Sequence, residues 1–251
     1  MFTVKKQIGR SISFMWDNKK LETLQELKER VGRYNRTSLP VYGGMDTNGN
    51  LWKKVDEFGN MKTFIGNTTV FLLPEEVKAR IHTIQNKLYE ACPDVFAEPL
   101  VADTFHITLH DLLNGEESAD LRWRMGEIEG RAKELVHQIG ERNEEIRLKS
   151  SVLFSMVSTS MVLGFEPADE ESCQRIMEYH QLFQELVYLN YSLTPHVTVA
   201  YYRPCRIHTP QVKKLQEVID WVNTQEPIEV TLSSKMLEYQ IFSNMNHYIG
   251  K

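Results

Sequence analysis

The chain has 251 residues, 41% hydrophobic and 10% aromatic, which is enough to bury a substantial core as one bilobal domain or two closely joined lobes. Its 29 basic and 34 acidic residues give a net charge of −5, which argues against binding to extended duplex DNA and favours a small or single-stranded ligand. No apolar run has membrane-spanning length, no signal-peptide segment is visible, and Cys92, Cys173 and Cys205 show neither pairing nor metal-ligand spacing. These features predict a cytoplasmic protein with no membrane partner.

Residues 1–64 are predicted to form an accessory extension. A short amphipathic helix is indicated by four apolar residues: Leu21, Leu24, Leu27 and Val31. A Gly- and Asn-rich stretch follows, in which residues 56–60 are predicted to be the turn of a hairpin between Leu51-Trp52 and residues 61–64.

Residues 65–157 are predicted to form a first lobe. Val70 to Leu73 indicates a buried strand that stops at Pro74, where a helix begins. The apolar positions of that helix are Val77, Ile81, Ile84 and Leu88. A strand through His106 follows, and then a long helix through Leu121, Met125, Ile128, Ala132, Leu135 and Ile139. Residues 145–157 are strand-like.

Residues 158–251 repeat this order and are predicted to form a second lobe. A strand at 162–165 precedes Pro167, and a helix through Cys173, Ile176, Phe183 and Leu186 leads to a strand through His196. A helix through Val212, Leu215, Val218 and Val222 then precedes strand-like residues 228–242. The repeat predicts an α+β protein of two related lobes, each with a small, mostly antiparallel sheet flanked by helices.

The two lobes carry matching motifs at equivalent places, Thr104-Phe-His-Ile-Thr-Leu109 and Thr194-Pro-His-Val-Thr-Val199. Alternate side chains of a strand share a face, so each motif presents His and Thr together while its apolar residues face a core. Two such strands facing each other predict a cleft that holds two imidazoles and two hydroxyls.

With these motifs, residues 65–251 resemble the 2H phosphoesterase superfamily, which is named for two His-x-Thr motifs in two pseudo-symmetric lobes around a central cleft. The resemblance implies action on cyclic phosphates or on 2′-5′ or 3′-5′ phosphodiesters of nucleotides or RNA ends. By this resemblance His196 is the general base and His106 the general acid, and Thr108 and Thr198 hold the non-bridging phosphate oxygens.

The residue types suit this chemistry, because cleavage requires one group to take a proton from water and another to give one to the departing ribose oxygen. Imidazole, with an ordinary pKa of about 6.5, serves in either state. The scheme needs no cofactor and no metal. Two alternatives stay open: a metal site built from His106, His110 and His196, ranked below the metal-free scheme, and a non-catalytic nucleotide- or RNA-binding module that uses the same cleft.

Further substrate-binding residues are predicted next to the motifs. By strand alternation, His110 shares a side with His106 and Thr108. Tyr202 likewise shares a side with His196, so both are predicted at the rim of the cleft.

Two other candidates depend on the comparison with the superfamily. A basic residue is frequent there where Tyr201 stands, and Arg203 is its candidate replacement if the chain turns at Pro204. Some relatives are similar in entering the first strand through Gly-Asn-Thr, here residues 66–68, so Phe64, Asn67 and the preceding loop are candidates to cap the cleft. A simple edge hairpin is the favoured alternative for that loop.

Overall fold

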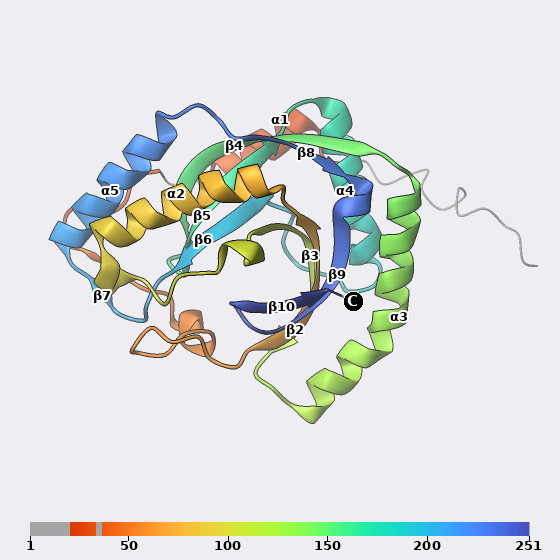
Figure 1. The fold of residues 1–251 in the computed structure, drawn as a ribbon, viewed down its shortest axis with the longest axis horizontal. Helices are drawn as coiled ribbons and strands as arrows, with labels where there is room; N and C mark the ends of the chain where they lie inside the picture. Colours follow the sequence, from red (N-terminus) through yellow and green to blue (C-terminus); the bar gives the residue numbers. More distant parts are fainter. Residues whose placement is uncertain (1–20, 34–36, 251) are drawn as a thin grey trace, which may run out of the picture.

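In the computed structural model of the protein, residues 21–33 and 37–250 are described, so residues 1–20 and 34–36 of the predicted extension lie outside the described residues. The elements run in the order α1 (Leu24–Gly32), β1 (Met45–Asp46), η2 (Gly49–Lys53), β2 (Ile65–Leu72), α2 (Glu75–Ala91), η3 (Pro93–Val95), η4 (Ala102–Thr104), β3 (His106–Gly115), α3 (Ala119–Glu141), β4 (Glu145–Met156), β5 (Ser160–Pro167), α4 (Glu170–Gln184), β6 (His196–Tyr201), β7 (Arg206–Ile207), α5 (Thr209–Asn223), β8 (Glu229–Ser233), η5 (Ser234–Met236), β9 (Leu237–Asn244) and β10 (His247–Gly250) (Figure 1).

Within the described residues the strands form two four-stranded sheets, in the orders β10-β9-β2-β3 and β6-β5-β4-β8, and a short pair of β1 with β7. Every pairing is antiparallel. The predicted α+β, two-lobed class is confirmed, and the two motif strands, β3 and β6, lie at corresponding edges of the two sheets.

The two sheets do not follow the predicted lobe boundaries, because the repeats exchange strands. β4, which ends the first repeat, pairs with β5 of the second sheet, and β9, which follows α5, pairs with β2 of the first sheet. The sheets therefore do not correspond to residues 65–157 and 158–251. Apolar alternation marks each segment as a strand but does not say which strand it pairs with.

Helices also cross between the two sheets. α2 follows a strand of the first sheet but packs on β6 and α5, whereas α4 follows a strand of the second sheet and packs both on β4 of that sheet and on β3 of the first (Figure 1). The predicted apolar positions that are buried in these helices are Val77, Ile81, Ile84, Leu88, Leu121, Ala132, Leu135, Ile139, Cys173, Ile176, Phe183, Val212, Leu215, Val218 and Val222.

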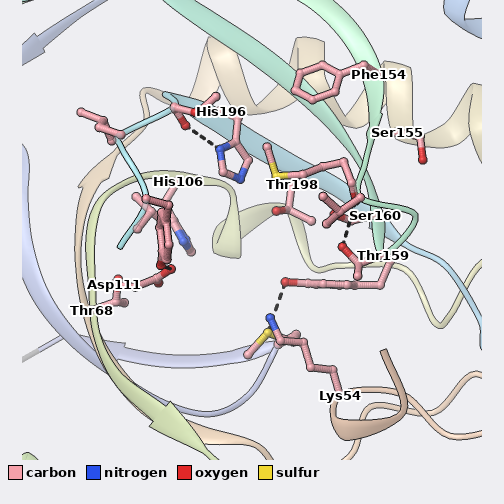
Figure 2. Close-up of a pocket in the computed structure, with 18 of the residues that line it drawn as sticks. Lys54, Thr68, His106, Asp111, Phe154, Ser155, Thr159, Ser160, His196 and Thr198 are labelled. Atoms are coloured by element: carbon pink, nitrogen blue, oxygen red, sulfur yellow. Dashed lines mark hydrogen bonds between the residues drawn. The ribbon is translucent and has the colours of Figure 1, made fainter. Parts of the chain in front are cut away.

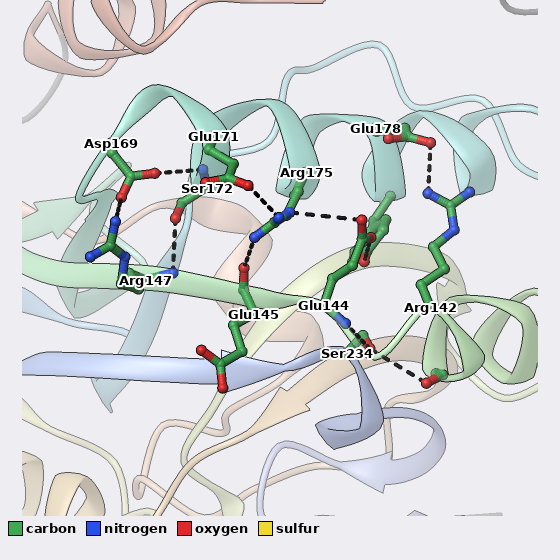
Figure 3. A network of polar contacts seen from close by, with 12 residues as sticks. Arg142, Glu144, Glu145, Arg147, Asp169, Glu171, Ser172, Arg175, Glu178 and Ser234 are labelled. Carbon is green, nitrogen blue, oxygen red and sulfur yellow. Dashed lines mark hydrogen bonds and ion pairs between the residues drawn. The ribbon is translucent and has the colours of Figure 1, made fainter.

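Polar contacts fix α4 against β4 (Figure 3). The Asp169 side chain caps the helix by accepting from the backbone N of Ser172 at 2.8 Å, and the Ser172 hydroxyl accepts from the backbone N of Arg147 at 3.0 Å. One turn later Arg175 donates to the carbonyl of Glu145 at 2.7 Å. The cap contributes about 1 kcal/mol to the helix, and the two hydrogen bonds with the backbone of β4 hold α4 against that strand.

The extension contains the predicted helix and turn but not the predicted hairpin. Residues Leu51 and Trp52 belong to the 3₁₀ helix η2, and pairing is reduced to a single bridge between Val55 and Met61. The turn at 56–60 is present, because the Asp56 carboxylate accepts from two backbone N–H groups of that turn at 2.9 Å. Leu51 and Val55 are fully buried, so this segment is part of the common core.

Replacing Gly66 by alanine is expected to destabilise the fold. A Cβ at this buried position of β2 would lie 2.7 Å from both Asn114 Cβ and the Leu113 carbonyl oxygen, and closer still to the Phe242 ring. Overpacking against groups that cannot move aside costs about 1–3 kcal/mol, which urea denaturation would measure. Gly126→Ala, at a helical position with nothing within 4 Å, is the control and is expected to lose no stability. Equal stabilities for the two variants would contradict this prediction.

Candidate active site

A pocket of about 1190 Å³ opens between the edges of the two sheets that carry the motifs. All four predicted catalytic residues line it: His106 and Thr108 from β3, and His196 and Thr198 from β6. Figure 2 shows His106, His196 and Thr198 in the pocket. The structure thus brings together two segments that are 90 residues apart in the chain.

Each motif histidine is held by the residue two positions before it. His196 Nδ1 lies 2.7 Å from the Thr194 carbonyl oxygen, and the backbone of Thr104 acts on the His106 ring, where it raises the pKa. Because a carbonyl only accepts, Nδ1 of His196 carries the proton and Nε2 is left with the lone pair in the neutral ring. The Tyr248 ring also packs edge-on against His106, with centroids 5.0 Å apart.

Both histidines are less basic than a histidine in water. Burial lowers the pKa of His106 to about 4, with a smaller contribution from the neighbouring His196, while the contacts with Thr104 and the Asp111 carboxylate act in the opposite direction. Burial also lowers the pKa of His196, and the Lys54 ammonium adds to this effect. Both rings are therefore neutral at pH 7 in the free protein, and a bound phosphate anion would raise both pKa values.

A β-bulge lies at the last residue of each motif and changes which residues face the pocket. Thr108 pairs with Val70 but His110 with the adjacent Thr69, so Leu109 is an extra residue in β3. Val199 is the extra residue at the equivalent position of β6. An extra residue reverses the alternation of side chains, so Asp111 and Tyr201, each five positions after its histidine, line the pocket.

A helix of the opposite repeat fixes each bulge. Gln85 of α2 donates to the Val199 carbonyl at 3.0 Å, and His180 Nδ1 of α4 donates to the Leu109 carbonyl at 2.9 Å. Both donors stand ten residues after the first residue of their helix, 75 to 85 and 170 to 180. His180 also accepts from Gln184 at 3.2 Å, so both of its ring nitrogens are used structurally.

The bulges account for the positions of two predicted rim residues. The ring of His110 is 1% exposed and packs on His180 with centroids 4.9 Å apart, so His110 borders the pocket from its buried side rather than at the rim. Tyr202 is fully buried, stacks on Phe96 with centroids 5.5 Å apart, and does not line the pocket. Tyr201, not Tyr202, lies on the side of β6 that faces the pocket.

Arg203 and Asn67 also lie outside the pocket lining. The backbone N of Arg203 donates to the Val95 carbonyl at 2.8 Å, and its side chain lies beside Gly59 in the 56–60 turn. Asn67 fills a second bulge between β2 and β3, accepting from the backbone N of Leu113 at 2.9 Å and donating to the Tyr239 hydroxyl at 3.0 Å. Asn67 is fully buried, and these contacts assign it a structural role.

Sequence reasoning missed several pocket residues that come from distant segments. They are Arg30, Lys54, Asp111, Tyr191, Tyr201, Phe242 and Tyr248. Of the predicted capping elements, Phe64 does line the pocket. Asp111 accepts from the Tyr191 hydroxyl at 3.0 Å, which joins the loop before β6 to the motif strand of the other sheet. No local pattern marks Lys54 or Tyr248, because their place depends on tertiary packing.

The metal site considered from the sequence is not assembled, because the His110 ring lies with His180 rather than with His106 and His196. Within residues 21–33 and 37–250, no group of three or more His, Cys, Asp or Glu side chains is arranged to hold a metal ion.

In residues 21–33 and 37–250 no helix combines the length and apolar character needed to cross a bilayer.

No protein-family model and no curated protein matches the sequence. The fold is similar to that of a conserved Agrobacterium tumefaciens protein of unknown function, ATU0111, with a TM-score of 0.60 and 12% identity over 86% of this chain and 96% of that one. TT0787 of Thermus thermophilus has a TM-score of 0.47 and 15% identity over 74% and 93% of the two chains. Escherichia coli LigT has a TM-score of 0.45 and 15% identity over 76% and 96%. At such identities the likeness to ATU0111 shows the fold alone.

Proposed function

We propose that this protein is a 2H-type phosphodiesterase that opens a cyclic phosphate, or a 2′-5′ or 3′-5′ linkage, of a nucleotide or RNA end without a metal. The supporting observation is that two His-Thr pairs on equivalent strands line one pocket, each followed by the same bulge. A structural histidine such as His180 has both nitrogens satisfied, whereas His196 has a hydrogen bond from Nδ1 that leaves Nε2 for chemistry.

In this mechanism a water molecule attacks phosphorus and gives its proton to His196. The phosphorus–oxygen bond to the ribose breaks, and His106 donates a proton to the departing oxygen. Thr108 and Thr198 donate hydrogen bonds to the non-bridging oxygens, where negative charge builds up in the transition state. Entry of the phosphate anion favours protonation of His106, which is neutral in the free protein.

The test is to incubate the protein with EDTA and 2′,3′-cyclic nucleotides, 2′-5′ and 3′-5′ oligonucleotides and cyclic oligonucleotides, and to follow products by mass spectrometry. The control is the double variant His106→Ala/His196→Ala. Cleavage that survives chelation and vanishes in the variant is expected, and the product names the linkage.

Two results would change the conclusion. Cleavage that stops with EDTA and returns with a divalent ion would contradict the metal-free mechanism. Binding of a nucleotide without any product would favour the non-catalytic module.

A further inference from the structure

Lys54 places a cation in the pocket from outside both motif-bearing sheets (Figure 2). Its Nζ lies 5.1 Å from the ring centroid of Phe64 and 5.4 Å from that of Tyr201. All three residues line the pocket, and Tyr201 is the residue that the bulge of β6 turns inward. The ammonium therefore lies on the Thr198 side of the pocket, and its charge acts on His196.

Among the described residues Lys54 has no acidic partner, unlike Arg30, which is the other Lys or Arg side chain of the pocket. Arg30 is held by the Glu22 carboxylate at 2.7 Å and by the Leu193 carbonyl at 2.7 Å. Among the described residues, no carboxylate lies within 4.0 Å of Lys54 Nζ and no hydrogen-bond acceptor contacts it. A half-buried ammonium held only over ring faces keeps its three N–H donors for an incoming anion.

The backbone around Lys54 is fixed, so the cation is preorganised. Its neighbours Leu51 and Val55 are fully buried. Its backbone N donates to the Leu51 carbonyl at 2.9 Å, and its carbonyl accepts from Lys62 N at 2.8 Å. Because little chain ordering is needed on binding, a contact made by this side chain adds directly to affinity.

We propose that Lys54 Nζ binds a phosphoryl oxygen of the substrate on the Thr198 side of the pocket. The proposal rests on the proposed function in taking the pocket to hold a phosphate ester. The oxygen belongs either to the reacting phosphate or to a second phosphate of the same nucleotide, since the chemistry recognised is the same. In either case residues 49–64 form part of the substrate site rather than an edge hairpin.

The test measures binding, so that it does not depend on turnover. Adenosine 3′-monophosphate and adenosine 3′,5′-bisphosphate are titrated by calorimetry into the wild type, Lys54→Met, Lys54→Arg and the control Lys53→Met. Lys53 is adjacent and exposed, does not line the pocket, and gives the same change in net charge. A hydrogen bond to a charged group contributes about 1.5–3 kcal/mol, so Lys54→Met is expected to raise Kd about 10- to 100-fold, with much of the affinity restored in Lys54→Arg.

The two ligands distinguish the two phosphates. A loss with both assigns Lys54 to the reacting phosphate, and a loss with the bisphosphate alone assigns it to a second phosphate. Equal Kd values for wild type and Lys54→Met with both ligands, or a loss as large in Lys53→Met, would overturn the proposal, as would a wild type that binds neither ligand. Binding that depends on Lys54 without any turnover would overturn only the proposed catalysis. Thermal unfolding of each variant confirms that the fold is intact.

Discussion

Replacing either motif histidine by alanine is expected to lower kcat/KM for the cleaved substrate by about 10²–10⁴-fold, the usual contribution of general acid–base catalysis. The melting temperature should change little, because His106 and His196 line the pocket rather than fill the core. Because the two rings act as a unit, the double variant should lose little more than the worse single variant. Initial rates at several substrate concentrations, with circular dichroism of each variant, would measure both effects.

The pH dependence of the same reaction provides a second measure of the pair. Burial lowers both pKa values, so the form with one neutral and one protonated ring is most abundant below pH 6.5 in the free protein. The profile of kcat/KM should therefore be bell-shaped with its maximum below pH 6.5, and the two limbs report on the pair rather than on single residues. His137→Ala, on the exposed face of α3, is the control and should keep the wild-type rate. A single His106 or His196 variant with that rate would show the two-histidine mechanism to be wrong.

The sequence predicted the motif strands and their shared pocket but not the residues just beyond each motif. Strict alternation placed His110 and Tyr202 at the rim. The extra residues Leu109 and Val199 reverse that alternation and bring Asp111 and Tyr201 inward. A bulge leaves no clear mark in a short apolar strand, and these two are fixed by side chains from distant helices.

Local sequence patterns also did not predict which strands pair with one another in the sheets. The segments that form β4 and β9 were predicted as strands, yet each joins the sheet of the other repeat. The same limit applies to Lys54, which reaches the pocket because Leu51 and Val55 anchor its segment in the core. Periodicity predicted which residues are buried, and tertiary contacts decided which neighbours they have.

Replacing His110 by phenylalanine is expected to make the protein more stable and less sensitive to acid. The ring of His110 is buried, and neither of its nitrogens forms a hydrogen bond with any other described residue, although Gln184 lies near enough to oppose the lowering of its pKa. Burial, with a contribution from His180, lowers that pKa to about 4. A buried polar group without a partner costs about 1–3 kcal/mol, which phenylalanine would remove while still packing against His180 and Phe183.

The acid sensitivity follows from linkage. A histidine whose pKa falls from 6.5 to about 4 on folding binds fewer protons in the folded state than in the unfolded state. The free energy of unfolding is therefore unaffected by this group above pH 6.5 and decreases as the pH falls towards 4. For His110 this loss is about 3 kcal/mol, at about 1.4 kcal/mol per pH unit between the two pKa values. Urea denaturation between pH 7.5 and 4 should show a smaller decline for His110→Phe than for the wild type, and an unchanged decline for the control His137→Phe at an exposed position. An identical decline in all three proteins would mean that His110 has the same pKa in the folded and unfolded chains, and the acid response would then belong to His106, His180 and His196, whose pKa values burial also lowers.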